Sequence, residues 1–245
     1  MRGRAMSTIE ARLLALNSDG ANIIRLSVSD HAPRLGQLLQ LDADVQVWAS
    51  RLADRPEVVQ LASAHRELGF AIYAVSSGLY VHAYASLRLF LELSFASVYF
   101  SANELHRRKW VADRQDFSWS AALDEDNGVL SRSFVREFND SATDDASNQA
   151  KVVAQVYRHC SQFIHGKLAV TRELPDQLEY SHSVLNDWIE VAIDSAKAVI
   201  YLLYARYGEQ LISVANQGNL EATIEHSFGH LPEVRSRLGL PVESE

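Results

Sequence analysis

Apolar residues recur at intervals of three and four along several long stretches of this chain, and no other feature narrows its possible folds as much. The clearest stretch begins at Ser181 or Ser183 and continues to Tyr207. Its apolar positions are Val184, Leu185, Trp188, Ile189, Ala192 and Ile193. Residues spaced in this way share one face of an α-helix. The sequence also contains 11 Gly and 5 Pro among 245 residues, and so few interruptions favour long helices over many short strands and turns.

The predicted fold is all-α: a helical bundle with four principal long helices and a helical N-terminal annex. No segment shows the period-two alternation of a half-buried strand. The division into regions is residues 1–55 for the annex, 56–210 for the bundle, and 211–245 for C-terminal short helices and a tail. The four long helices are expected at about 56–76, 79–101, 149–165 and 183–207.

Helix boundaries are predicted from residues that begin or end helices. Pro56 suits the first position of a helix, and Gly166 and Gly208 suit the left-handed position just after a helix ends. In the annex, short amphipathic helices are expected over residues 21–28 and 35–51, with a break near Asp42.

Charge and cysteine usage restrict the function classes and the compartment. The formal net charge is 23 − 31 = −8, so the chain as a whole does not attract nucleic acid, although a local basic site remains compatible with that balance. Cys160 is the single cysteine, which excludes an intrachain disulfide and a cysteine-built zinc cluster and is typical of a reducing compartment. With no signal peptide apparent, we expect a cytoplasmic protein.

One uncharged stretch, residues 70–87, is long enough to cross a bilayer. It is interrupted by Ser76, Ser77 and His82 and continues directly into Arg88. Because polar interruptions are costly in lipid, we interpret this stretch as a helix buried in the bundle and expect no membrane segment.

The helix expected at residues 149–165 carries two distinct stripes. Its apolar stripe consists of Val152, Val153, Val156, Tyr157, Cys160 and Ile164. A polar stripe, formed by Arg158, Ser161, Gln162 and His165, follows the spacing i, i+3, i+4, i+7. Seven residues make nearly two turns, so Arg158 and His165 project from the same side about 10.5 Å apart along the helix axis.

The residue types in the polar stripe suit phosphate chemistry. Arginine is always charged and binds phosphate through its forked donors, and histidine titrates near neutral pH and exchanges protons. An imidazole at His165 would take the proton of a ribose 2′-hydroxyl or protonate the leaving oxygen, and the Arg158 guanidinium would stabilise charge on phosphorus. Ser161 and Gln162 lie between them and can position a polar ligand.

The run Tyr157-Arg-His-Cys-Ser-Gln-Phe-Ile-His165 resembles the Arg-(Asn/Asp/His)-x(3–5)-His motif of HEPN-type proteins. Here His159 fills the polar position after Arg158, and five residues separate it from His165. The resemblance implies that His159 belongs to the catalytic site with Arg158 and His165, where it would orient or assist. The resemblance implies a helical bundle that dimerises and joins two motifs into one composite site. It implies a metal-independent endoribonuclease without cofactors, acting as a toxin or antiphage-defence effector on RNA and restrained by an antitoxin or another partner protein.

Two alternatives to this interpretation stay open at the level of sequence. Arg158 and His159 can be solvated side chains, with His165 serving only to interact with the carboxyl end of its helix. Equally, the resemblance includes catalytically inactive members, which implies a scaffold or regulatory subunit of a defence or toxin–antitoxin assembly.

Two further groups of charged residues are candidates for a functional role. Arg88 and Glu92 lie four residues apart in the most apolar helix, where an ion pair either holds two helices in register or braces the site on the facing helix. Residues 106–110, His-Arg-Arg-Lys-Trp, form a dense basic run. This run is typical of a solvated helix end, and the alternative is contact with an RNA backbone.

Overall fold

In the computed structural model, which describes residues 2–212 and 218–241, the described residues form helices and no strand. This confirms the predicted all-α class. The elements in chain order are α1 (Arg2–Arg51), α2 (Val58–Ser76), α3 (Tyr80–Ala102), α4 (Glu104–Val111), α5 (Trp119–Ala122), α6 (Arg132–Phe138), the 3₁₀ turn η1 (Asp140–Ala142), α7 (Ala146–Ile164), α8 (Leu168–Thr171), α9 (His182–Ile212), α10 (Gly218–Phe228) and α11 (Pro232–Leu238). Residues 242–245 of the predicted tail lie outside the described residues.

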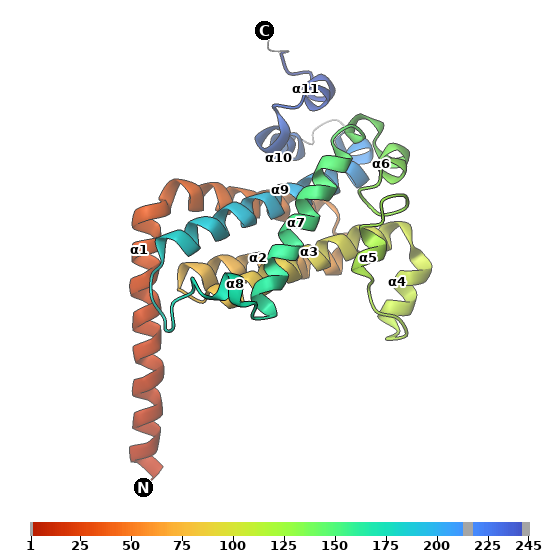
Figure 1. Ribbon diagram of the computed structural model, residues 1–245. Helices are drawn as coiled ribbons and strands as arrows, with labels where there is room; N and C mark the ends of the chain where they lie inside the picture. Colours follow the sequence, from red (N-terminus) through yellow and green to blue (C-terminus); the bar gives the residue numbers. More distant parts are fainter. Residues whose placement is uncertain (1, 213–217, 242–245) are drawn as a thin grey trace.

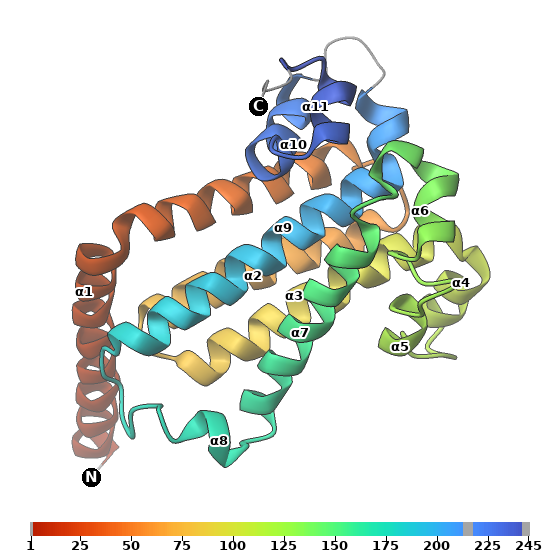
Figure 2. The ribbon, with the colours of Figure 1, turned by 45° about the horizontal axis from the view of Figure 1, so that its top comes forward.

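Helices α2, α3, α7 and α9 form the bundle, close to the positions predicted for the four long helices. The predicted start of α2 is wrong, because the helix begins at Val58 and Pro56 lies in the turn before it. Helices α2 and α3 make an antiparallel pair, and α7 crosses α3 and α9 (Figure 2). The turn between α2 and α3 requires a glycine because Gly78 has φ +84°, in the left-handed region. A Cβ at this position would also lie 3.0 Å from Cδ1 of Ile23 in α1.

Helix α9 lies at the centre of the core and is buried along most of its length. Large side chains from several helices surround it, among them Trp48 of α1 and Phe90 of α3. The indole nitrogen of Trp48 donates to Oγ1 of Thr223 at 2.9 Å, which connects α1 with α10. One hydrophobic core therefore joins the second half of α1, the bundle and the C-terminal helices.

The predicted end of α9 is wrong. Gly208 does not stop the helix, which continues to Ile212. A Cβ at position 208 would lie 2.5 Å from the Tyr204 ring and 3.0 Å from Nδ2 of Asn139. This glycine is therefore required for close packing inside the helix, which sequence spacing alone does not distinguish from a cap.

The annex also differs from its prediction. The chain forms one long helix from Arg2 to Arg51, and its interruption lies at His31 (φ −127°, ψ 18°) and not at Asp42. Pro33 explains the position because proline removes one helical hydrogen bond and its ring clashes with the preceding turn. Ile23 and Ser27, in the last turns before the kink, are buried. The beginning of the helix extends away from the bundle (Figure 1), and every residue from Thr8 to Asp19 is exposed.

The structure also places the uncharged stretch 70–87 and the basic run 106–110. Residues 70–87 lie in α2, the turn and α3, inside the bundle, and no described helix combines the length and apolarity needed to span a membrane. The basic run lies in its own helix, α4, after a break at Asn103.

Candidate functional site

Helix α7 presents its two predicted stripes to different surroundings. Val153, Val156 and Cys160 of the predicted apolar stripe are buried against α3 and α9, whereas Arg158 and His165 are exposed. Ser161 and Gln162, between them, are half-buried. The polar stripe therefore lies on the open face of the helix, as its spacing predicts. The predicted apolar stripe is wrong at Ile164, which is 39% exposed, and the buried side chain at this end of the helix is that of Phe163.

The end of α7 is closed by the backbone alone. Gly166 adopts φ +60°, its N–H donates to the carbonyl of Phe163, and the N–H of Lys167 donates to the carbonyl of Gln162, both at 3.0 Å. These two bonds are the Schellman arrangement that satisfies the last carbonyls of a helix. His165 is consequently not needed to cap these carbonyls with its side chain.

Arg158 and His165 have no partner for their side chains among the described residues. Neither takes part in a side-chain hydrogen bond, an ion pair or a ring contact there, and both face solvent. Ser161 differs, because its hydroxyl donates to the carbonyl of Tyr157 at 2.7 Å. The stripe thus offers a guanidinium and an imidazole that remain available to a ligand.

His159 follows Arg158 in the motif but does not lie beside it in space. Its ring packs edge-on against Tyr84 of α3, with centroids 5.4 Å apart, and against Phe163 at 5.3 Å. Burial lowers the pKa of His159, and the carboxylate of Asp187 in α9 partly opposes this shift. One residue corresponds to a rotation of about 100° around a helix, so His159 lies on the flank that contacts α3.

Arg88 and Glu92 connect α3 to α7 through the hydroxyl of Tyr157. Nη2 of Arg88 donates to this hydroxyl at 2.6 Å, and the hydroxyl donates to Oε1 of Glu92 at 2.8 Å. The Nε of Arg88 also donates to Oε1 of Glu92 at 3.1 Å. Trp119 of α5 stacks on the Tyr157 ring with a centroid distance of 4.2 Å. Arg88 and Glu92 therefore hold α7 one residue before Arg158, rather than lining the open stripe.

The Cys160 thiol and the basic run of α4 are less suited to a functional role. Burial raises the pKa of the Cys160 thiol to about 12, so this cysteine is no nucleophile near neutral pH. In α4, Arg107 and Arg108 bind the carboxylate of Glu104 at 2.7 and 2.6 Å, and these hydrogen bonds lower the pKa of Glu104 to about 2. Part of the basic run is thus neutralised within its own helix.

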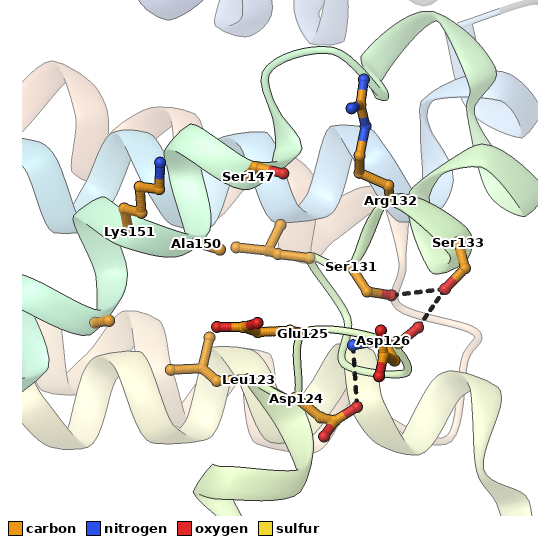
Figure 3. A pocket seen from close by; sticks show the side chains of 12 residues that line it. Leu123, Asp124, Glu125, Asp126, Ser131, Arg132, Ser133, Ser147, Ala150 and Lys151 are labelled. Carbon is orange, nitrogen blue, oxygen red and sulfur yellow. Dashed lines mark hydrogen bonds between the residues drawn. The ribbon is translucent and has the colours of Figure 1, made fainter.

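A cavity of about 720 Å³, which was not predicted from the sequence, lies between α7 and the segment 123–133 (Figure 3). Ser147, Ala150, Lys151 and Ala154 of α7 line it. Ala154 precedes Arg158 by one turn, so the cavity lies on the same side of α7 as the polar stripe. Lys151, seven residues before Arg158, was the available signal, but the opposing wall comes from a separate segment that spacing does not reveal.

No clustered set of three or more His, Cys, Asp or Glu side chains in residues 2–212 and 218–241 is placed to hold a metal ion. Comparison of the chain with models of protein families, with curated proteins and with solved structures found no match. The motif and its geometry on α7 are therefore the observations that bear on function.

Proposed function

We propose that this protein is a metal-independent endoribonuclease of the HEPN type that acts as a homodimer. The observation that carries the proposal is the open stripe on α7, where Arg158 and His165 share one side and neither side chain has a partner among the described residues. The backbone closure of the helix end at Gly166 supports it, because the imidazole of His165 is not needed to cap the last carbonyls.

Cleavage would proceed through the ribose 2′-hydroxyl. In the proposed reaction a histidine removes its proton, the 2′-oxygen attacks phosphorus, and the bond to the 5′-oxygen breaks as a second acid protonates that oxygen. The products are a 2′,3′-cyclic phosphate and a 5′-hydroxyl. Arg158 would neutralise charge that builds on the phosphate oxygens, and His159 would fix the helix against α3 as a positioning residue.

A dimer would supply both proton-transfer groups. One imidazole does not hold the attacking and the leaving oxygen at the same time, whereas His165 from two copies provides a base and an acid. Ile164 and Leu168 flank His165 and are 39% and 68% exposed. A second copy that covers these apolar side chains would bring the two motifs together, since exposed apolar groups favour association.

The proposal is tested by cleavage of labelled tRNA and mRNA in the presence of EDTA. Wild type should cleave, and both Arg158→Ala and His165→Ala should reduce the rate by at least 100-fold, with cyclic phosphate ends in the wild-type products. Matched controls are Arg136→Ala and His230→Ala, which remove exposed side chains of the same types elsewhere. Cleavage that survives both α7 substitutions would disprove the assignment of the site.

A second candidate is a scaffold or regulatory subunit of a defence or toxin–antitoxin assembly, without catalysis. The observation that favours it is the exposed first part of α1, where Ile9, Leu13 and Leu14 are each at least 60% exposed. Under this alternative, replacing both Arg158 and His165 would leave the cellular phenotype intact, whereas polar substitutions at Leu13 and Leu14 would abolish it. For an effector nuclease, the double substitution at Arg158 and His165 would remove the phenotype.

A further inference from the structure

The cavity beside α7 has the dimensions of a site for a small ligand. Its volume of about 720 Å³ lies within the roughly 300–1,000 Å³ common for ligand pockets. Leu123 and Leu130 contribute apolar surface, and hydroxyls of Ser131, Ser133 and Ser147 add polar groups. Figure 3 shows the segment 123–126 on one side and α7 on the other, with the space between them open.

The carboxylates of this segment differ in their hydrogen bonding. Oδ1 of Asp124 accepts the N–H groups of Asp126 and Asn127 at 3.1 and 2.8 Å, and these backbone bonds lower its pKa. Ser133 donates to the carbonyl of Asp126, which fixes the opposite end of the loop. The carboxylates of Glu125 and Asp126, by contrast, have no partner among the described residues, and that of Glu125 projects from the loop toward α7 (Figure 3).

The facing wall carries the opposite charge. Lys151 of α7 lines the cavity and has no partner among the described residues, whereas Arg132 pairs with Asp144 at 3.3 Å. A free carboxylate on one wall and a free ammonium on the other fit a ligand that carries hydrogen-bond donors at one end and a negative charge at the other.

We propose that this cavity binds a guanine nucleotide, with the base at Glu125 and the phosphate at Lys151. Guanine presents two adjacent donors, N1–H and N2–H, which match the two oxygens of one carboxylate. Adenine and cytosine place an acceptor beside their amino group, and uracil places acceptors on both sides of its single N–H, so each of them sets a lone pair against Glu125. Leu123 and Leu130 provide apolar surface for the ring.

The position of the cavity extends this inference to RNA, a step that depends on the proposed nuclease function. Lys151 and Arg158 lie on one side of α7, about 10.5 Å apart along the axis. A strand that follows this side would pass Lys151 and then Arg158, with its guanine in the cavity and the next phosphates near His165. The nuclease would then prefer to cleave close to a guanosine.

The first test measures binding of 5′-GMP and 5′-AMP to the full chain by calorimetry. We expect saturable binding of GMP at least tenfold tighter than that of AMP. Glu125→Gln should remove this preference, because an amide opposes one of the two guanine donors with its own donors. Lys151→Ala should weaken GMP at least fivefold and leave guanosine unchanged. Glu137→Gln, which removes an exposed carboxylate from α6 outside the cavity, is the matched control.

The second test separates the two sources of this ligand. RNA oligonucleotides with one guanosine or with none are compared for binding to wild type and to Glu125→Gln. A preference for the guanosine-containing strand that Glu125→Gln abolishes identifies a base of RNA, and a preference seen with GMP alone identifies a free nucleotide. No saturable GMP binding, equal binding of GMP and AMP, or a preference unaffected by Glu125→Gln would overturn the proposal.

Failure of the nuclease proposal remains distinguishable from failure of this one. His165→Ala should leave GMP binding unchanged because the imidazole lies about three turns beyond Ala154, the last cavity-lining residue of α7. If the wild-type protein binds GMP selectively but cleaves no RNA, the guanine site is supported and the nuclease proposal is disproved. If the protein cleaves RNA but shows no guanine preference in binding or at the product ends, the nuclease proposal is supported and the guanine site is disproved.

Discussion

The two faces of α7 differ in their surroundings: one packs in the core of the bundle, and the other is exposed. The buried face, with Val153, Val156, Cys160 and Phe163, packs against α3 and α9 and fixes the helix in the bundle. The opposite face carries Arg158 and His165, whose side chains make no hydrogen bond, ion pair or ring contact among the described residues. A stabilising role explains the first set but not the second. Substitutions on the two faces should therefore separate stability from function.

The largest effect on stability is expected at Phe163. Its ring stacks on Tyr84 with a centroid distance of 3.7 Å, and it is 7% exposed. Phe163→Ala should lower the free energy of unfolding by about 3–4 kcal/mol, because it removes buried apolar surface and leaves a cavity. Urea unfolding followed by circular dichroism measures this change. Phe70→Ala, at a ring that is 55% exposed, should cost less than about 1 kcal/mol.

A smaller loss is expected where the two faces meet. Tyr157→Phe removes the hydroxyl that accepts from Arg88 and donates to Glu92. Because this cluster is partly exposed, the free energy of unfolding should fall by about 1 kcal/mol. Tyr73→Phe, which alters an exposed ring of α2, is the control and should change nothing measurable. Equal stability of the two variants would show that the Arg88–Glu92–Tyr157 cluster does not hold α7.

The pH dependence of stability tests the position of His159. Burial lowers its pKa in the folded protein below the unfolded value of about 6.5, so the unfolded chain binds more protons as the pH falls through that region. This contribution to stability is present above pH 6.5 and is lost toward the lower folded pKa.

His159→Gln removes this titration while leaving the other histidines in place. The difference in unfolding free energy between wild type and this variant should therefore be more favourable to wild type at pH 7.5 than at pH 5.5. His82→Gln, at an exposed histidine of α3, is the matched control. A difference that does not change with pH would contradict the packing of His159 against Tyr84.

The sequence predicted most of this fold because its principal signals are local. Helical spacing identified α9, and the His-Gly pair identified the end of α7. The helix end predicted at Gly208 was wrong because a glycine needed for packing and a glycine that caps a helix look alike in sequence. At the annex, Pro33 carried the signal for the kink, and the acidic residue Asp42 did not.

For the candidate site, spacing predicted the common face of Arg158 and His165 but not the separate position of His159. The role of Tyr157 was also hidden, because its ring follows the apolar stripe while its hydroxyl bonds to α3. The cavity could not be predicted, since residues 123–133 and α7 meet only after folding. Contacts between distant segments are the part that local patterns leave undetermined.

The smallest effect on stability should accompany the largest effect on function. In Arg158→Ala/His165→Ala, the free energy of unfolding should stay within about 0.5 kcal/mol of wild type, because surface side chains without partners contribute little to stability. The same preparation should then be assayed with labelled RNA in EDTA. If Arg158 and His165 form the cleavage site, the double variant should be stable and should have lost cleavage. A stable double variant that cleaves RNA at the wild-type rate would show that Arg158 and His165 do not form the cleavage site.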